Sequence, residues 1–265
     1  KVNKSNAYYL KSKLIQNEKT NLGLYLNYRE LNFEDPNRKT EPSINSRILY
    51  SDQFFDRLVS INTNYENTSG SLAQQEFTYL EVEPGQGVYT WIDYNNNGIQ
   101  ELEEFEIAAF QDQAKYVRIY LPNQVYLKTH QNKFSQSVVL NPAKWINEKG
   151  AKKILSYFYN QTTFLSERKI IRDGGNFNFN PFSSDEEDLL GLNSSFSNSL
   201  FYNRGKQQHS VTYTFLNNKI KNQLSIGSQS SSNKSHQLQY THLFVKTWLL
   251  TMNAKTVAST LTSEN

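Results

Sequence analysis

The stretch Ser210-Val211-Thr212-Tyr213-Thr214-Phe215 alternates strictly between polar and apolar residues. Successive side chains of a β-strand point to opposite faces of a sheet, so this period of two predicts a strand with one polar and one apolar face. The same alternation recurs elsewhere in the chain, at 21–29, 59–65, 237–244 and 248–254. The sequence therefore predicts an all-β fold.

Short polar segments separate these runs and are typical of turns, among them 67–70, 217–218 and 230–233. From Leu192 onward the pattern predicts an uninterrupted antiparallel meander, with strands that include 208–217, 222–229 and 236–245. These strands have one face nearly free of charge, and their length of about 9–12 residues is what a tilted strand needs to cross a bilayer. We therefore expect a membrane β-barrel, or part of one.

The composition narrows the class of protein. Aromatic residues reach 14% of the 265 residues, too many for a disordered chain. There is no cysteine, which excludes disulfides and thiolate chemistry, and no apolar stretch long enough for a transmembrane helix. The net charge of +3 is spread along the chain, so nucleic acid is not expected as a partner.

The segment 93–104 reads Asp-Tyr-Asn-Asn-Asn-Gly-Ile-Gln-Glu-Leu-Glu-Glu and matches a twelve-residue calcium loop. Such a loop places oxygen ligands at positions 1, 3, 5, 7, 9 and 12 and a glycine at position 6, here Gly98. The expected ligands of a calcium ion are therefore Asp93, Asn95, Asn97, Ile99 through its carbonyl, Glu101 and Glu104. The alternative is a bare Asn-Gly hairpin turn surrounded by solvated acids.

The flanks of this loop differ from those of a helix-loop-helix calcium site. Residues 87–92 are β-branched and aromatic and predict a strand. Residues 101–110 predict a short helix with an apolar stripe. Trp91 and Tyr94 are candidate ligand-binding residues that could stack on sugar rings, whereas packing of the loop is the alternative for Trp91.

Motifs of the common enzyme classes are absent from the sequence. The four histidines, His130, His209, His236 and His242, form no metal-binding spacing, and we expect exposed strand histidines. The dense glutamates of 101–106 suit metal ligation or solvation better than a glycosidase pair, whose carboxylates normally come from separated strands. We therefore do not expect an enzyme.

The segment 85–142 resembles large outer-membrane proteins of Bacteroidota. The resemblance rests on Gly85-Gln-Gly-Val-Tyr-Thr-Trp-Ile-Asp93, Asn96-Asn-Gly98, Glu103-Glu-Phe-Glu106 and Phe134-Ser-Gln-Ser-Val-Val-Leu-Asn-Pro142. Those proteins are long chains of amphipathic strands that often carry a calcium-type loop in an extramembrane part. The resemblance implies an outer-membrane location and architecture, and it transfers no catalytic residues.

Together these observations predict an antiparallel outer-membrane β-barrel, or part of one, with a short helix after a calcium-type loop. We expect residues 1–265 to form one strand-rich unit of a longer barrel, with 84–120 as an inserted calcium-loop segment. Its expected partners are outer-membrane lipid and other proteins of a surface assembly, in which it is structural or serves transport or secretion. The rival is a soluble, secreted β-sandwich that binds glycans with the help of calcium.

Overall fold

A computed structural model describes residues 4–35, 39–172, 177–182, 188–206, 208–224, 227–245 and 247–263. The chain forms two compact units, one of residues 1–70 with 128–265 and one of residues 71–127. The inserted segment expected at 84–120 lies within the second unit. Each unit is described below by itself.

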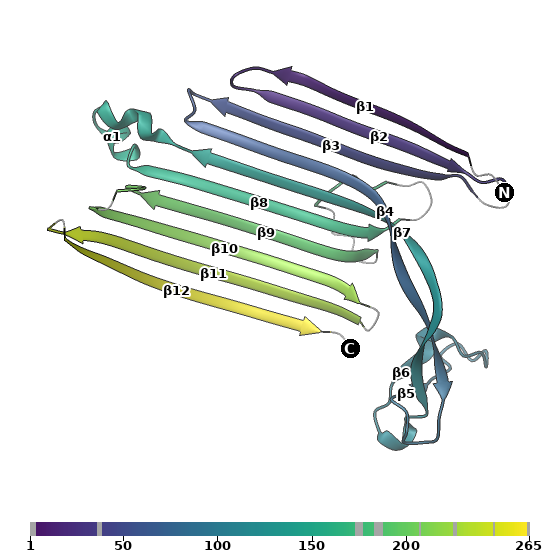
Figure 1. The fold of residues 1–265 in the computed structure, drawn as a ribbon. Coiled ribbons are helices and arrows are strands. Elements are labelled where there is room, and N and C mark those ends of the chain that lie inside the picture. The colour runs from purple at the N-terminus through teal and green to yellow at the C-terminus, as the bar shows by residue number, and fades with distance from the viewer. Residues whose placement is uncertain are drawn as a thin grey trace. The chain divides into compact units, whose positions relative to one another are not determined.

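The first unit is a single-layer antiparallel sheet, in which strands adjacent in the meander lie side by side (Figure 1). Among the described residues ten strands follow one another from edge to edge, in the order β1-β2-β3-β4-β7-β8-β9-β10-β11-β12. Their bounds are β1 (Lys4–Gln16), β2 (Asn21–Asn32), β3 (Glu41–Phe54), β4 (Val59–Glu81), β7 (Tyr116–Leu140), β8 (Phe158–Ile171), β9 (Leu189–Tyr202), β10 (His209–Leu224), β11 (Gly227–Phe244) and β12 (Trp248–Ser263). The predicted all-β antiparallel meander is confirmed.

The strand register separates the side chains of the sheet into two faces, because residues paired across neighbouring strands point the same way. One face, called here the apolar face, carries Leu24, Leu26, Ile48, Tyr50, Ile61, Tyr65, Phe134, Val138, Phe164, Phe196, Leu200, Tyr213, Phe215, Leu238, Tyr240, Leu250 and Met252. The opposite, polar face carries Asn45, Arg47, Asn62, Asn64, Ser135, Ser137, Thr163, Ser197, Ser199, Thr212, Thr214, Gln237, Gln239 and Asn253.

Little of the apolar face is buried. Large side chains on it stay exposed, including Tyr213 at 36%, Leu238 at 47% and Met252 at 59%. Among the described residues, the buried apolar side chains besides proline are those of Ala114, Tyr116, Ile170 and Leu189. Over most of the apolar face, the described part of the chain therefore provides no second layer that would form a conventional hydrophobic core.

Residues 177–182, from the connection between β8 and β9, cover one part of the apolar face. The Phe182 ring lies 5.2 Å from that of Phe134 and 5.9 Å from that of Phe164, measured between centroids. Asn132 Nδ2 donates to the Asn178 carbonyl at 2.7 Å, and Ser166 Oγ donates to the Pro181 carbonyl at 2.9 Å. Sheet side chains thus replace the hydrogen bonds that this extended segment cannot make internally.

Three of the expected turns are wrong. Residues 67–70 lie inside β4, 217–218 inside β10 and 230–233 inside β11. Asn217 and Asn218 pair with Lys234 and Asn233, at the end of the turn expected at 230–233. The two segments therefore stabilise each other in the extended conformation. Asparagine and serine favour turns only weakly, and ladder hydrogen bonds to neighbouring strands override that preference.

The second unit consists of the outer parts of β4 and β7 with a small hairpin, β5 (Tyr89–Trp91) and β6 (Phe105–Ile107). Strand β5 pairs with β6 and, through Tyr89 and Tyr116, with β7. The strand expected over 87–92 is therefore present as β5. The short helix expected after the loop is a single 3-10 turn, η1 (Leu102–Glu104), and the chain continues as β6 and the 3-10 turn η2 (Gln111–Gln113).

The helix after the loop ends after one turn because the next apolar residue, Phe105, contacts aromatic residues from an extended backbone. Phe105 pairs with Trp91 across the hairpin, and its ring stacks on Tyr79 at 4.0 Å between centroids. In the first unit, the 3-10 helix η3 (Pro142–Asn147) and helix α1 (Ala151–Leu155) connect β7 to β8. Among the described residues, no helix is long and apolar enough to cross a membrane.

Candidate functional site

The loop 93–104 connects β5 to β6 in the 71–127 unit. Its tight path requires left-handed backbone at Asn96, with φ of 55°, and at Gly98, with φ of 69°. Asparagine and glycine are the residues that adopt this conformation at least cost, which explains the Asn-Asn-Gly sequence at this point.

The first three expected ligands fold the loop around their own oxygens. Asp93 Oδ1 accepts from the Asn97 amide at 3.1 Å, and Asp93 Oδ2 accepts from the Gly98 amide at 2.9 Å. Asn95 Oδ1 accepts from the Asn97 amide at 2.9 Å, and Asn97 Oδ1 accepts from the Ile99 amide at 2.6 Å. These side-chain oxygens therefore lie inside the turn, where backbone amides orient them.

The two expected glutamate ligands differ in their surroundings. Glu101 is exposed and accepts from Asn95 Nδ2 at 2.9 Å and from Asn97 Nδ2 at 3.3 Å. Glu104 is only 3% exposed, and it accepts from Trp91 Nε1 at 2.9 Å and from the Tyr94 amide at 3.3 Å. The structure therefore brings Asp93, Asn95, Asn97 and Glu101 into one hydrogen-bonded loop and seats Glu104 against Trp91.

The donor set of this loop is made of oxygen atoms, which suits a hard cation such as calcium. In the part of the chain that the structure describes, no three histidine or acidic side chains gather closely enough to hold a metal. The set at 93–104 is instead mixed, because two of its six members are amides and Ile99 contributes only a backbone carbonyl. Its partial fit to calcium rests on Asp93 and on the amide oxygens.

Trp91 and Tyr94 also make contacts within the unit. The Trp91 indole is held by Glu104, as packing of the loop requires. Tyr94 is 58% exposed and its hydroxyl donates to Glu106 Oε1 at 2.6 Å. This hydrogen bond to a carboxylate, with smaller contributions from desolvation and the glutamate charge, raises the pKa of Tyr94 above its usual 10.0. Of the two, Tyr94 presents the more accessible ring.

An aromatic cluster anchors the hairpin that carries the loop. Besides the stack of Phe105 on Tyr79, Phe105 meets Tyr116 and Tyr79 meets Tyr89, both at 5.0 Å between centroids. Gln100 Nε2, from the second half of the loop, donates to Tyr116 Oη at 3.0 Å. The aromatic contacts of Phe105 and the hydrogen bond of Gln100 thus both attach the loop to its unit.

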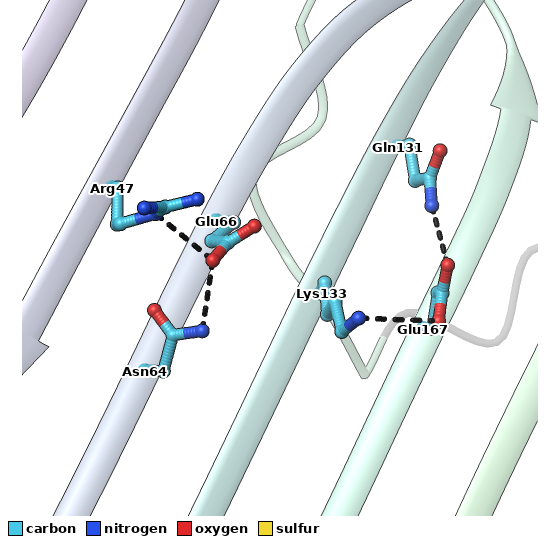
Figure 2. Close-up of polar contacts among 6 residues, drawn as sticks. All are labelled: Arg47, Asn64, Glu66, Gln131, Lys133 and Glu167. Carbon is cyan, nitrogen blue, oxygen red and sulfur yellow. Dashed lines mark hydrogen bonds and ion pairs between the residues drawn. The ribbon is translucent and has the colours of Figure 1, made fainter.

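A second polar cluster lies on the polar face of the sheet, and sequence reasoning did not find it. Arg47 Nε is 2.9 Å from Glu66 Oε1, and Asn64 Nδ2 donates to the same oxygen at 2.9 Å. Glu167 accepts from Gln131 Nε2 at 2.5 Å and has Lys133 Nζ at 3.9 Å. Figure 2 shows the two groups on adjacent strands.

These four charges form a row of alternating sign across β3, β4, β7 and β8: Arg47, Glu66, Lys133 and Glu167. Opposite charges on neighbouring strands stabilise a sheet modestly and keep each other paired. Each of these residues occupies a polar position in the alternation of its strand. That position is the only feature of the sequence that indicates the face on which the four charges lie. Their alignment depends on strand register, which the sequence does not contain.

The histidines follow the expectation only in part. His209 and His236 are exposed, whereas His130 is fully buried, so the expectation of an exposed strand histidine is wrong there. The His130 ring lies 5.6 Å from those of both Phe177 and Phe179, which belong to the segment that covers this part of the sheet. A covering segment between two strands cannot be anticipated from the alternation of β7.

Comparison of the chain with protein-family models, with curated proteins and with solved structures finds no match. Any statement on function must therefore rest on the residues and on their geometry.

Proposed function

We propose that the sheet is part of the wall of an outer-membrane β-barrel, with its apolar face toward lipid and its polar face toward the interior. The observation that carries this proposal is the separation of the two faces along the strands, together with the exposed apolar side chains. A lipid environment accepts such a face, because the walls of membrane barrels alternate apolar residues outside with polar residues inside. The protein would be a structural, transport or secretion component of a surface assembly.

Strand length and charge placement support this proposal. Strands β8 and β9 have 14 residues each and β10 has 16, more than the roughly 9–11 that a tilted strand needs to cross the hydrocarbon. On the apolar face, Lys219, Lys221 and Lys234 lie toward the end of the sheet away from α1, where β10 ends and β11 begins. Charges at strand ends can lie in water while the apolar part of the same face meets lipid.

The rival, a soluble glycan-binding β-sandwich, is favoured by one polar network on the apolar face. Asn160 Nδ2 donates to Asn198 Oδ1 at 3.3 Å, and Asn198 Nδ2 donates to Thr162 Oγ1 at 2.7 Å. Polar groups are costly against lipid, although mutual hydrogen bonding reduces that cost. In the rival, another layer of protein would cover the face, and calcium would order the 93–104 loop beside Tyr94.

The two candidates differ in what Leu238 contacts. We expect Leu238→Arg to block insertion into lipid vesicles, because an arginine at the lipid-facing midplane costs about 2–4 kcal/mol. Gln239→Arg, its neighbour on the polar face, should insert like the wild type. The measurement is protection of the strands from protease after refolding in the presence of vesicles.

Leu238 is 47% exposed in the sheet alone, so an arginine there would change stability by only about 0.5 kcal/mol if the face met water. Normal insertion of Leu238→Arg would overturn the assignment of this face to lipid. Equal failure of Leu238→Arg and Gln239→Arg would overturn the assignment of the two faces.

Calcium belongs to this proposal as a structural ion of the 71–127 unit, which we place in water. It would bind Asp93, Asn95, Asn97, the Ile99 carbonyl, Glu101 and Glu104, and it would supply positive charge to an acidic loop. Asp93 and Asn97 already have oxygens oriented within the turn. Glu104 would have to share oxygens that Trp91 and the Tyr94 amide now engage.

A further inference from the structure

The polar face is hollowed over β1 to β4 by a groove of about 880 Å³, to which β7 also contributes. Its polar lining includes amides and hydroxyls such as Asn62, Asn64 and Ser135. The charged residues of the lining are Lys11, Lys13, Arg47 and Glu66. Three cations face one carboxylate, so the described lining has a formal charge of +2 at neutral pH.

The cations lie at defined places in the sheet. Lys11 pairs with Tyr25, Tyr25 with Arg47 and Arg47 with Glu66, so these four residues form one row across four strands. Neighbouring strands are about 4.8 Å apart, which places the Cα atoms of Lys11 and Arg47 roughly 10 Å from each other. Lys13 stands two residues along β1 from Lys11, on the same face.

The three cations are not equally neutralised. Arg47 is held by Glu66, with 54% of its side chain exposed. Lys11 and Lys13 are exposed, and within the described part of the chain neither forms an ion pair with an acidic side chain. Positive charges that line a concavity raise the local concentration of anions, and lysine binds carboxylate or phosphate as a point charge.

We propose that this groove binds a small solute that carries two anionic groups, carboxylate or phosphate. One group lies between Lys11 and Lys13 and the other meets Arg47, while Tyr25 of β2, which stands between these cations in the row, contacts the part of the solute between the two groups. The proposal deepens the proposed function, on which it rests, because it names the class of solute that the polar interior favours. Glu66 competes with the solute for Arg47.

The experiment is a calorimetric titration of the full chain, in detergent micelles, with pyrophosphate in one arm and succinate in the other. Binding in either arm, weakened by added salt, is expected, and the stronger arm identifies phosphate or carboxylate as the preferred group. Spermidine, a cation of similar size, should not bind. Absence of binding in both arms to the folded chain would overturn the proposal.

Variants test the placement of the charges. Lys11→Gln should weaken binding about tenfold, and Glu66→Gln should strengthen it because Arg47 is released. Lys169→Gln, which removes a lysine of β8 outside the groove, should leave binding unchanged. Equal weakening by Lys11→Gln and Lys169→Gln, or no gain from Glu66→Gln, would contradict a defined site.

This titration does not depend on insertion into lipid. Vesicle insertion without binding of either anion would overturn the groove alone. Anion binding by a chain that fails to insert would overturn the barrel wall and leave the groove as a site of a soluble protein.

Discussion

Glu104 is a buried carboxylate at the end of the calcium-type loop. As the last position of a calcium-type motif it was identifiable from spacing alone. Its 3% exposure and its hydrogen bond from Trp91, thirteen positions earlier in the chain, were not. A buried carboxylate needs such donors, because an unpaired one would carry a large desolvation cost. Glu104 thus joins β5 to the end of the loop through its hydrogen bonds from Trp91 and the Tyr94 amide.

Among the glycines of the 71–127 unit, Gly87 leaves the least room for a side chain. A Cβ atom there would lie 2.6 Å from the Tyr116 nitrogen and 2.8 Å from the Ala114 oxygen, and backbone atoms cannot move aside as a flexible side chain can. The Gly87 amide also donates to the Ala114 carbonyl at 3.0 Å. We expect Gly87→Ala to cost about 1–3 kcal/mol in unfolding free energy of this unit.

Limited proteolysis of residues 71–127 in increasing urea measures this cost. The neighbouring Val88 has a side chain that is 52% exposed, so Val88→Ala serves as the matched control and should change little. Identical urea profiles for the two variants would show that the close approach of Gly87 to β7 is not maintained in solution.

At the scale of elements, alternation predicted the type of the strands better than their number and their ends. The separate strand expected at 222–229 is wrong, because this segment divides between β10, which ends at Leu224, and β11, which begins at Gly227. The run from Ser210 to Phe215 lies in β10, but that strand continues to Leu224 through Asn217 and Asn218. Beyond the apolar part of the sheet, most residues of this strand are polar. In sequence, such a polar strand end has a composition similar to that of a turn. Pairing with β9 and β11 on both sides decides the outcome, and pairing is long-range information.

The loop 93–104 carries the prediction that belongs to this scale. We expect calcium to protect residues 85–115 from protease, because an ion that joins Asp93 to Glu104 ties β5 to β6. Asp93→Ala should abolish this protection and leave the large sheet folded. The sheet can be followed separately by its circular dichroism.

Asp112→Ala removes an acid of the same unit outside the loop, at η2, and should keep the response to calcium. If calcium changes neither the protease sensitivity nor the melting of residues 85–115 in the wild type, the loop is the bare turn and not a calcium site.

At the scale of the whole molecule, the single layer is the property that most constrains behaviour. Both edge strands are unpaired on their outer sides within the described chain, and all residues of β12 are exposed. Unpaired edges and exposed apolar side chains such as Leu250 promote association in water. We therefore expect the wild-type chain to require detergent to stay in solution.

Sedimentation with and without detergent measures this requirement, and flotation with lipid vesicles shows what replaces the detergent. A chain that remains monomeric in plain buffer would contradict the lipid assignment and favour the soluble β-sandwich. The net charge of +3 is too small to keep such an apolar surface dispersed by repulsion alone.

The path of β4 and β7 has a consequence for how this chain can vary. The chain leaves the large sheet along β4 and re-enters it along the neighbouring β7, so residues 71–127 connect two strands that are already adjacent. A Cβ atom at Gly70 would lie 3.3 Å from Thr129 Oγ1, which shows how close the exit and re-entry points are. The segment is therefore an enlarged hairpin, and natural variants could lengthen, shorten or exchange it without shifting the register of the other strands.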